Sequence, residues 1–217
     1  MKIKGSNILI TGGASGIGKI MGRMALEKGA NCVIIWDINQ TNIDSTVKEF
    51  EALGITPDNQ YAANNQTTQL DSINTAIAGG ADILVVNQVT SGASDTAEDI
   101  LAAAGDIPVV FFNRPIGVDG SEAPVLTENN TVAFIGTDAP DAGHMQGQMI
   151  GEYLLANYDA VDFNGDGIIS YAMMKGDEAN VEAIYRTQYG VEDANAVLEA
   201  AGKPALQYFD ASAAENA

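Results

Sequence analysis

The stretch NILITGGASGIG, residues 7–18, decides how this chain begins to fold. Asn7–Thr11 is apolar and has the length of a strand, and Gly16–Lys28 has the length and apolar spacing of a helix. Glycines separate the two. A helix that starts directly after such a turn points its unpaired backbone N–H groups and its positive dipole end at the turn, which favours a bound phosphate. The stretch therefore predicts a strand–loop–helix unit that binds an anion.

The glycines and a later acid have the spacing of a dinucleotide site. Gly12 permits the sharp turn, Gly16 lets a pyrophosphate approach the backbone, and Gly18 allows close packing of the helix on the strand. Asp37 ends the next apolar run, where a carboxylate would bind the ribose 2′-hydroxyl of NAD. We predict that NAD is the cofactor and that its binding residues are Gly12, Ser15, Gly16, Ile17, Gly18 and Asp37.

Strand-like and helix-like segments alternate along the whole chain. The predicted strands are 7–11, 31–37, 59–64, 81–87, 107–113, 131–137, 168–175 and 205–210. The predicted helices are 16–28, 42–53, 69–78, 94–104, 140–156, 180–190 and 191–201. This order predicts an α/β fold with a doubly wound parallel sheet. A polar stretch rich in proline and glycine, 114–130, predicts a hinge. We therefore expect a Rossmann-like lobe at 1–113 and a smaller α/β lobe at 131–217.

Charge changes sharply near Gly54–Asn59. Residues 1–54 have six Lys/Arg and five Asp/Glu, a net charge of +1, whereas residues 55–217 have a net charge of −20. The total of −19 argues against nucleic acid or an anionic membrane surface as a partner. No apolar run is long enough to span a membrane, and the N-terminus lacks the pattern of a signal peptide, so a cytoplasmic location is expected.

Residues 1–54 closely resemble the start of short-chain dehydrogenases/reductases, whose signature Thr-Gly-x-x-x-Gly-x-Gly is matched at Thr11–Gly18. The resemblance implies an NAD-dependent oxidoreductase, but later motifs depart from it. Residues 87–90, Asn-Gln-Val-Thr, stand where that family has Asn-Asn-Ala-Gly. Tyr171 and Lys175 have the spacing of the catalytic pair, yet they fall on a predicted strand, where such residues lie ~13 Å apart. We predict no catalytic residue.

From about Asn59 the chain resembles periplasmic galactose/glucose-binding proteins. The matching blocks include 81–87, 107–114, 134–138 and 162–167. The resemblance implies a sugar site formed by Asn87, Asn180, Glu182 and Arg186. It also implies that part of the site is missing, because the glycine loop replaces the first-strand aromatic and acid, and Ala214 aligns with the stacking tryptophan. A helical pair of Glu182 and Arg186 is the simpler reading of those two residues.

A second candidate site is the loop after residue 161. Asp162, Asn164, Asp166, Ile168 and Ser170 occupy the positions from which oxygen atoms bind calcium in an EF-hand loop. Position 12 of that pattern is Met173 and not glutamate, which excludes a self-contained EF-hand. In the resembled family the closing glutamate comes from a later part of the lobe, and this sequence ends before it. The sequence predicts an incomplete calcium site.

The two halves together predict a chimera that joins a dehydrogenase-like opening to a truncated sugar-binding protein. Our interpretation is a non-catalytic scaffold that binds NAD(H) through its ADP half and keeps a remnant of a hexose site. Two alternatives stay open: an NAD-dependent oxidoreductase, and a recombinant or engineered fold without a ligand. Apolar edges on a small second lobe also predict a homodimer or modest stability.

Overall fold

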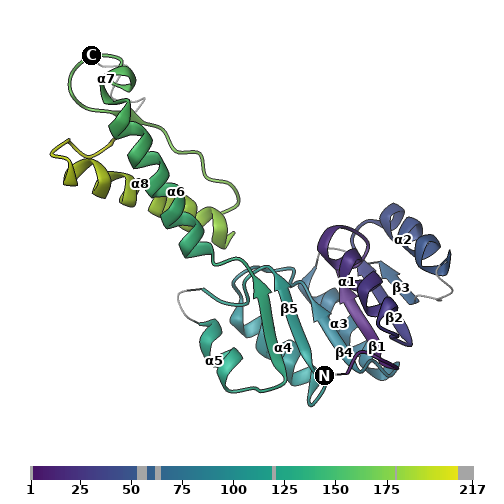
Figure 1. Cartoon of the computed structure of the whole chain (residues 1–217). Helices are drawn as coiled ribbons and strands as arrows, with labels where there is room; N and C mark the ends of the chain where they lie inside the picture. Colours follow the sequence, from purple (N-terminus) through teal and green to yellow (C-terminus); the bar gives the residue numbers. More distant parts are fainter. Residues whose placement is uncertain (1, 53–57, 62–64, 119–120, 179, 210–217) are drawn as a thin grey trace. The chain divides into compact units, whose positions relative to one another are not determined.

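The computed structural model describes residues 2–52, 58–61, 65–118, 121–178 and 180–209. The chain divides into two compact units, Met1–Gly136 and Thr137–Ala217, which Figure 1 shows in the colours of the sequence. We call them the first unit and the second unit.

The first unit is a six-stranded parallel sheet with helices between the strands. Its strands are β1 (Asn7–Thr11), β2 (Cys32–Asp37), β3 (Asp58–Tyr61), β4 (Ile83–Val86), β5 (Val109–Asn113) and β6 (Val132–Gly136). Its helices are α1 (Gly16–Glu27), α2 (Gln40–Ala52), α3 (Gln66–Ala78), α4 (Ser94–Ala104) and α5 (Glu122–Thr127). The strand order is β3-β2-β1-β4-β5-β6, which confirms the predicted parallel, doubly wound α/β sheet.

Successive residues of a strand point to opposite faces of the sheet and pack into two separate apolar clusters, one on each face. Leu9 points into a cluster with Ile73 of α3 and Ile100 of α4. Ile8 and Ile10, its neighbours in β1, belong to a cluster that contains residues of α1 and α2. The two faces arise because the chain winds outward from β1 in one direction and then from β4 in the other, with right-handed crossovers. This winding makes the boundary between β1 and β4 the centre of the sheet.

The charge boundary does not interrupt this sheet. Residues 53–57 lie outside the described residues, but β3 pairs in parallel with β2, for example at Ile34 and Asp58. Strand β4 pairs with β1 through Ile8 and Ile83, and with β5 on its other side. The two portions of the sequence therefore share one hydrogen-bonded sheet, with β4 as a central strand.

The domain boundary differs from the one predicted from the sequence. Residues 114–130 contain helix α5 and two buried side chains, Ile116 and Val125, which pack in the same cluster as β5. Residues 131–137 were expected to start the second lobe, yet β6 is the sixth strand of the first sheet. The polar stretch is therefore a short crossover anchored by two apolar residues, and the units divide after Gly136.

The second unit consists mainly of two long helices. Its elements are α6 (Ala139–Ala156), α7 (Tyr158–Val161), β7 (Ser170–Tyr171), α8 (Val181–Ala200) and β8 (Gln207–Tyr208). The predicted strands 168–175 and 205–210 shrink to the two-residue strands β7 and β8. The two helices predicted on either side of Gly190 are one helix, α8, because Gly190 is buried and continues the helical backbone.

Helices α6 and α8 pack against each other (Figure 1), and glycines of α6 lie at the contact. Gly143, Gly147 and Gly151 lie one turn apart on α6, and a Cβ on any of them would overlap atoms of α8. The opposite face of α6 exposes apolar side chains, with Met145, Met149 and Tyr153 each about two-thirds exposed. No helix in the described part of the chain is long and apolar enough to cross a membrane.

Candidate functional site

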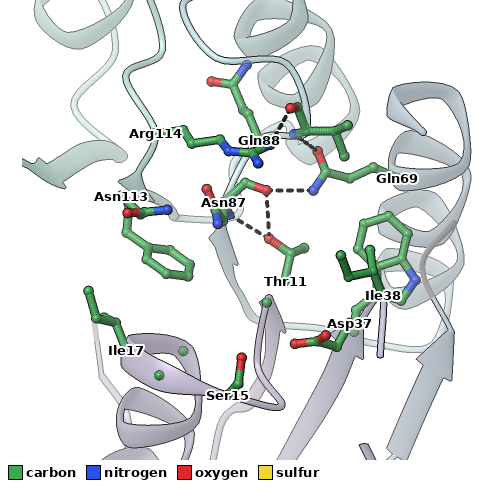
Figure 2. Close-up of a pocket in the computed structure, with 16 residues that line it drawn as sticks. Thr11, Ser15, Ile17, Asp37, Ile38, Gln69, Asn87, Gln88, Asn113 and Arg114 are labelled. Atoms are coloured by element: carbon green, nitrogen blue, oxygen red, sulfur yellow. Dashed lines mark hydrogen bonds between the residues drawn. The ribbon is translucent and has the colours of Figure 1, made fainter. Parts of the chain in front are cut away.

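A cavity of about 430 Å³ opens at the carboxyl ends of four strands in the first unit. Figure 2 shows its lining, which comes from the ends of β1, β2 and β5, from the segments that follow β1, β2, β4 and β5, and from Gln69 of α3. It lies beside β1 and β4, where the winding of the sheet reverses, and such a point is where open α/β sheets commonly bind ligands. The lining residues are Thr11, Gly12, Ser15, Gly16, Ile17, Gly18, Trp36, Asp37, Ile38, Gln69, Asn87, Gln88, Val89, Phe112, Asn113 and Arg114.

The glycine loop forms one wall of the cavity. Gly12 and Gly16 have φ angles of 69° and 48°, in the left-handed region that glycine adopts without steric cost. A Cβ at Gly18 would overlap the carbonyl oxygen of Gly12, whereas a Cβ at Gly16 would meet no atom within 4 Å. Gly18 therefore lets α1 start against the turn, and Gly16 leaves open space for a ligand next to the backbone.

Helix α1 begins at this wall. Ser15 is its N-cap residue with an extended backbone, and the Ser15 side chain makes no capping hydrogen bond. The first turn contains no acidic side chain. The first N–H groups of a helix have no intrahelical acceptor, so this turn offers donors and a partial positive charge to the cavity.

Asp37 is held rigidly at the end of β2. Its Oδ2 accepts a hydrogen bond from the Ala14 N–H at 3.0 Å, and its Oδ1 accepts one from the Asn39 N–H at 3.0 Å. The side chain is only 6% exposed. Each carboxylate oxygen can accept a second hydrogen bond, so Asp37 can receive the hydroxyl groups of a ligand without losing its own supports.

Asn87 faces the glycine loop from the end of β4. Its backbone is fixed by Thr11, whose Oγ1 donates to the Asn87 carbonyl at 3.2 Å, and by Gln69, whose Nε2 donates to the same carbonyl at 2.8 Å. The Asn87 side-chain amide lies over Gly12. Its Oδ1 is buried and has no hydrogen-bond partner in the described residues. A buried, unpaired amide oxygen is costly, and a ligand that donates to it would remove that cost.

The end of β5 contributes residues that the sequence did not single out. Asn113 has a φ of 68°, which is uncommon for a residue other than glycine. Arg114 donates from Nη1 to the carbonyl of Gln88 at 3.1 Å and also to the carbonyl of Val89. The sequence places Arg114 at the start of the predicted hinge, because prolines and glycines follow it. Because the sequence predicts a strand at 107–113, it also predicts that Asn113 and Arg114 lie at the carboxyl end of that strand. This position is the signal by which the two site residues could have been found.

The four predicted sugar ligands divide between the two units. Asn87 lies in the first unit, with the predicted cofactor residues, whereas the other three lie at the start of α8. Asn180 caps that helix by accepting from the Ala183 N–H, and Glu182 accepts from Thr137 Oγ1 at 3.0 Å. Arg186 is exposed. Asn180 and Glu182 therefore already have local structural roles.

The predicted calcium loop folds as a turn with its acids already engaged. The two oxygens of Asp162 accept from the N–H groups of Gly165 and Gly167, and Asp166 accepts from the Ile168 N–H. Asn164 Nδ2 donates to Asp166 Oδ2 at 2.8 Å. Ser170 lies in β7. Among the described residues, no group of three or more His, Cys, Asp or Glu side chains is arranged to hold a metal ion.

Tyr171 and Lys175 do not share a helix. Tyr171 lies in β7 and packs edge-on against Tyr208, and the Lys175 ammonium bonds to Glu178 at 2.6 Å. The predicted strand is present at Tyr171 but does not extend to Lys175, which lies outside any helix or strand. His144, which has no cysteine or histidine companion in the sequence, bonds through Nδ1 to Asp193 at 2.7 Å and stacks on Tyr189.

The fold and the cavity define a doubly wound α/β protein with a ligand site at the carboxyl edge of its sheet. Residues 36–217 match the family described as periplasmic binding protein domain. The chain belongs to this family. The match begins within β2, so it includes Asp37 and the ends of β4 and β5 but leaves the glycine loop outside.

Two curated relatives match different parts of the chain. The D-galactose/methyl-galactoside binding periplasmic protein of Haemophilus influenzae is 33% identical over 133 residues, which are 61% of this chain and 38% of that protein. The 3-oxoacyl-[acyl-carrier-protein] reductase of Thermotoga maritima is 49% identical over 53 residues, 24% of this chain and 21% of that protein. The chain thus spans well under half the length of either relative. Both predicted resemblances are confirmed.

Solved structures of short-chain dehydrogenases resemble the chain only in general fold. A metagenomic short-chain oxidoreductase in complex with NADP matches with a TM-score of 0.49 and 14% identity, over 63% of this chain and 83% of that protein. A likeness at this level supports no conclusion about ligand or activity.

Proposed function

We propose that the protein is a non-catalytic small-molecule binder that holds NAD(H), mainly by its ADP half, in the cavity at the carboxyl edge of the first sheet. One observation carries the proposal: the six residues selected from sequence spacing all line one cavity, beside the reversal point of the sheet. They come from two strand ends, so their convergence is a property of the fold and not of sequence proximity.

The residues present fit the adenosine diphosphate part of NAD. The open space at Gly16 and the N-terminus of α1 suit the pyrophosphate, and the supported carboxylate of Asp37 suits the ribose hydroxyls. The nicotinamide half has less support, because residues 87–90, Asn-Gln-Val-Thr, depart from the Asn-Asn-Ala-Gly motif of short-chain dehydrogenases. We therefore assign the binding energy to the ADP half.

A non-catalytic role is supported by the positions of Tyr171 and Lys175. NAD(H) would supply hydride transfer when bound, and a helical Tyr-x-x-x-Lys pair would be needed to use it as short-chain dehydrogenases do. Here one residue lies in a strand and the other bonds to Glu178. Substrate-dependent oxidation of NADH that is lost in Tyr171→Phe would favour the alternative, an NAD-dependent oxidoreductase.

Isothermal titration of the full chain with NADH tests the proposal. Asp37→Asn keeps the shape of the side chain but removes its charge, and the loss of a charge-assisted hydrogen bond should weaken NADH binding about tenfold. Asp71→Asn, an exposed residue of α3, is the matched control and should leave binding unchanged. Absence of NADH binding by the folded wild-type chain would refute the proposal.

A hexose is the second candidate ligand, favoured by the unpaired Oδ1 of Asn87 and by the similarity to a galactose-binding protein. A sugar hydroxyl could donate to that oxygen. Titration with galactose distinguishes the two ligands. Micromolar galactose binding that Asn87→Leu abolishes, together with no NADH binding, would replace the dinucleotide proposal with the sugar one. We make no calcium proposal, because the acids of the predicted loop are bonded within the loop.

A further inference from the structure

The cavity contains one cationic side chain among its lining residues, Arg114. The chain as a whole has a net charge of −19, so a cationic side chain in its cavity is unusual. Arg114 has no carboxylate within ion-pair distance in the described part of the chain. Its positive charge is therefore not cancelled by a neighbouring acid of that part.

The hydrogen bonds of Arg114 fix one edge of its guanidinium and leave another edge available. Nη1 donates to the carbonyls of Gln88 and Val89. A guanidinium has five N–H donors, and no described residue accepts from Nε or Nη2 of Arg114. A guanidinium edge held in place in this way suits two oxygens of one phosphate, since arginine binds phosphate through paired hydrogen bonds.

Two independent positive features thus face the same cavity. Figure 2 shows Arg114 beside Asn87 on the wall that faces the glycine loop, with Asp37 on the far side of Asn87. The N-terminus of α1 belongs to the loop wall. Three buried polar atoms of this lining have no hydrogen-bond partner among the described residues: Asn87 Oδ1, Gln88 Oε1 and Trp36 Nε1. Gln88 and Trp36 are almost fully buried. The cavity therefore has an acid for hydroxyl groups at one side and a cation for an anion at the other.

We infer that the preferred ligand is a nucleoside diphosphate with a free terminal phosphate, bound with its ribose at Asp37, its first phosphate at the glycine loop and its terminal phosphate on Arg114. The inference rests on the proposed function and narrows its ligand class. A terminal phosphate has a charge of about −1.5 to −2 at pH 7, whereas the same phosphate within NAD is esterified and bears a second nucleoside. Arg114 therefore interacts more strongly with a free terminal phosphate than with the esterified phosphate of NAD.

Isothermal titration of the full chain with ADP, NAD⁺ and adenosine tests the inference. ADP should bind about tenfold more tightly than NAD⁺, and adenosine should bind most weakly. Arg114→Gln removes the charge but keeps an N–H donor for the Gln88 and Val89 carbonyls. It should weaken ADP about tenfold to a hundredfold and leave adenosine unchanged. Arg23→Gln is the control, because Arg23 is an exposed residue of α1 and the substitution also removes one positive charge. It should leave all three affinities unchanged.

The outcomes separate this inference from the proposed function. If ADP and NAD⁺ bind equally to the wild-type chain, the inference is wrong and the proposed function stands. If Arg114→Gln lowers ADP and adenosine binding by the same factor, Arg114 only supports the loop after β4, and the inference is again wrong. If the folded wild-type chain binds none of the three ligands, both are wrong. The comparison of wild-type affinities does not depend on any variant folding.

Discussion

The two units have similar sequence patterns but bury their apolar side chains to different degrees. In the first unit, helices cover both faces of a six-stranded sheet, and each face has a large apolar cluster. In the second unit, the two strands are two residues long, and one apolar cluster contains Tyr158, Ile169 and Leu198. The other buried apolar residues among its described residues are Ala139, Val181, Tyr185 and Ala194. Apolar runs alternate with amphipathic helices in both.

The difference shows what an amphipathic helix needs from its surroundings. Helix α4 buries Ala97, Ile100 and Ala104 on the sheet. Helix α6 buries a glycine row against α8, while Met145 and Met149 on the same helix remain exposed. Burial of an apolar side chain contributes ~1.5–3 kcal/mol, so the first unit is expected to be the more stable of the two.

Truncation of one buried leucine in each unit provides the largest expected effect. Leu84→Ala in β4 should lower the free energy of unfolding of the first unit by about 4 kcal/mol, because the cavity forms inside a dense cluster. Leu198→Ala in α8 should cost the second unit about 2.5 kcal/mol, because its smaller cluster can relax around the gap. Both leucines are 0% exposed, so the two substitutions can be compared directly.

Urea unfolding measures the two effects separately. Trp36 is the chain's single tryptophan and is buried in the first unit, so its fluorescence follows that unit. Hydrogen exchange of α8 amides follows the second. Equal losses in the two units would show that the second unit has a core as effective as that of the first.

The helix pair of the second unit provides the next test. Gly147→Ala would place a Cβ against the Tyr189 carbonyl oxygen, which belongs to the backbone and cannot move aside. We expect a loss of about 3 kcal/mol in the second unit. Gly190→Ala on α8 is the matched control: its Cβ would meet mainly the end of the flexible Gln146 side chain, 3.3 Å away. Alanine there should be neutral or should stabilise the helix by up to ~1 kcal/mol.

Thermal unfolding followed by circular dichroism checks this pair of variants. If Gly147→Ala is as stable as Gly190→Ala, then α6 and α8 do not approach each other as closely as the glycine row indicates.

Self-association through the exposed face of α6 is a smaller expected effect. Met145, Met149 and Tyr153 form an apolar stripe at helical spacing, and the sequence already predicted a homodimer or modest stability. Met149→Lys should weaken self-association about tenfold without unfolding the chain, because it adds a charge to a stripe that a dimer would bury. Sedimentation velocity over a range of concentrations measures this. A wild-type chain that is monomeric throughout would contradict the dimer expectation.

The smallest expected effect is a pH dependence confined to the second unit. Burial raises the pKa of the Tyr158 phenol, and the charges of Asp162 and Asp166 raise it further. The folded unit therefore favours the neutral phenol, whose hydroxyl donates to the Gly167 carbonyl at 2.8 Å. This contribution to stability is complete below the ordinary tyrosine pKa of about 10 and is lost as pH rises through the higher folded-state value.

Urea unfolding at about pH 9 and about pH 11 measures the loss, with hydrogen-exchange or circular-dichroism detection of the second unit. Tyr158→Phe should be less stable than wild type at the lower pH, because it lacks the hydroxyl, but should lose less stability between the two values. An equal alkaline loss in Tyr158→Phe would assign the effect to other groups.

Most of the first unit was predictable because its signals are local. Thr11–Gly18 specifies a strand, a turn and a helix within a few residues, and α4 has the predicted bounds, Ser94–Ala104. The second unit was less predictable. The apolar letters of 168–175 favour a strand, but a strand also needs partners, and only Ser170 and Tyr171 pair with β8. The end of the first unit was misplaced because Ile116 and Val125 are two apolar residues in a polar stretch, and only packing shows that they are buried.

The sequence by itself determined the parallel α/β class, the glycine loop and Asp37, because each depends on short-range spacing and on the backbone freedom of glycine. Only the tertiary structure decided which distant residues complete the site. Asn87 and Arg114 lie far from the glycine loop in sequence and reach the same cavity because β4 pairs with β1 and β5 pairs with β4. The order of the strands depends on which strands are buried and on the handedness of the crossovers. Both are properties of the entire sheet and not of a short stretch of sequence.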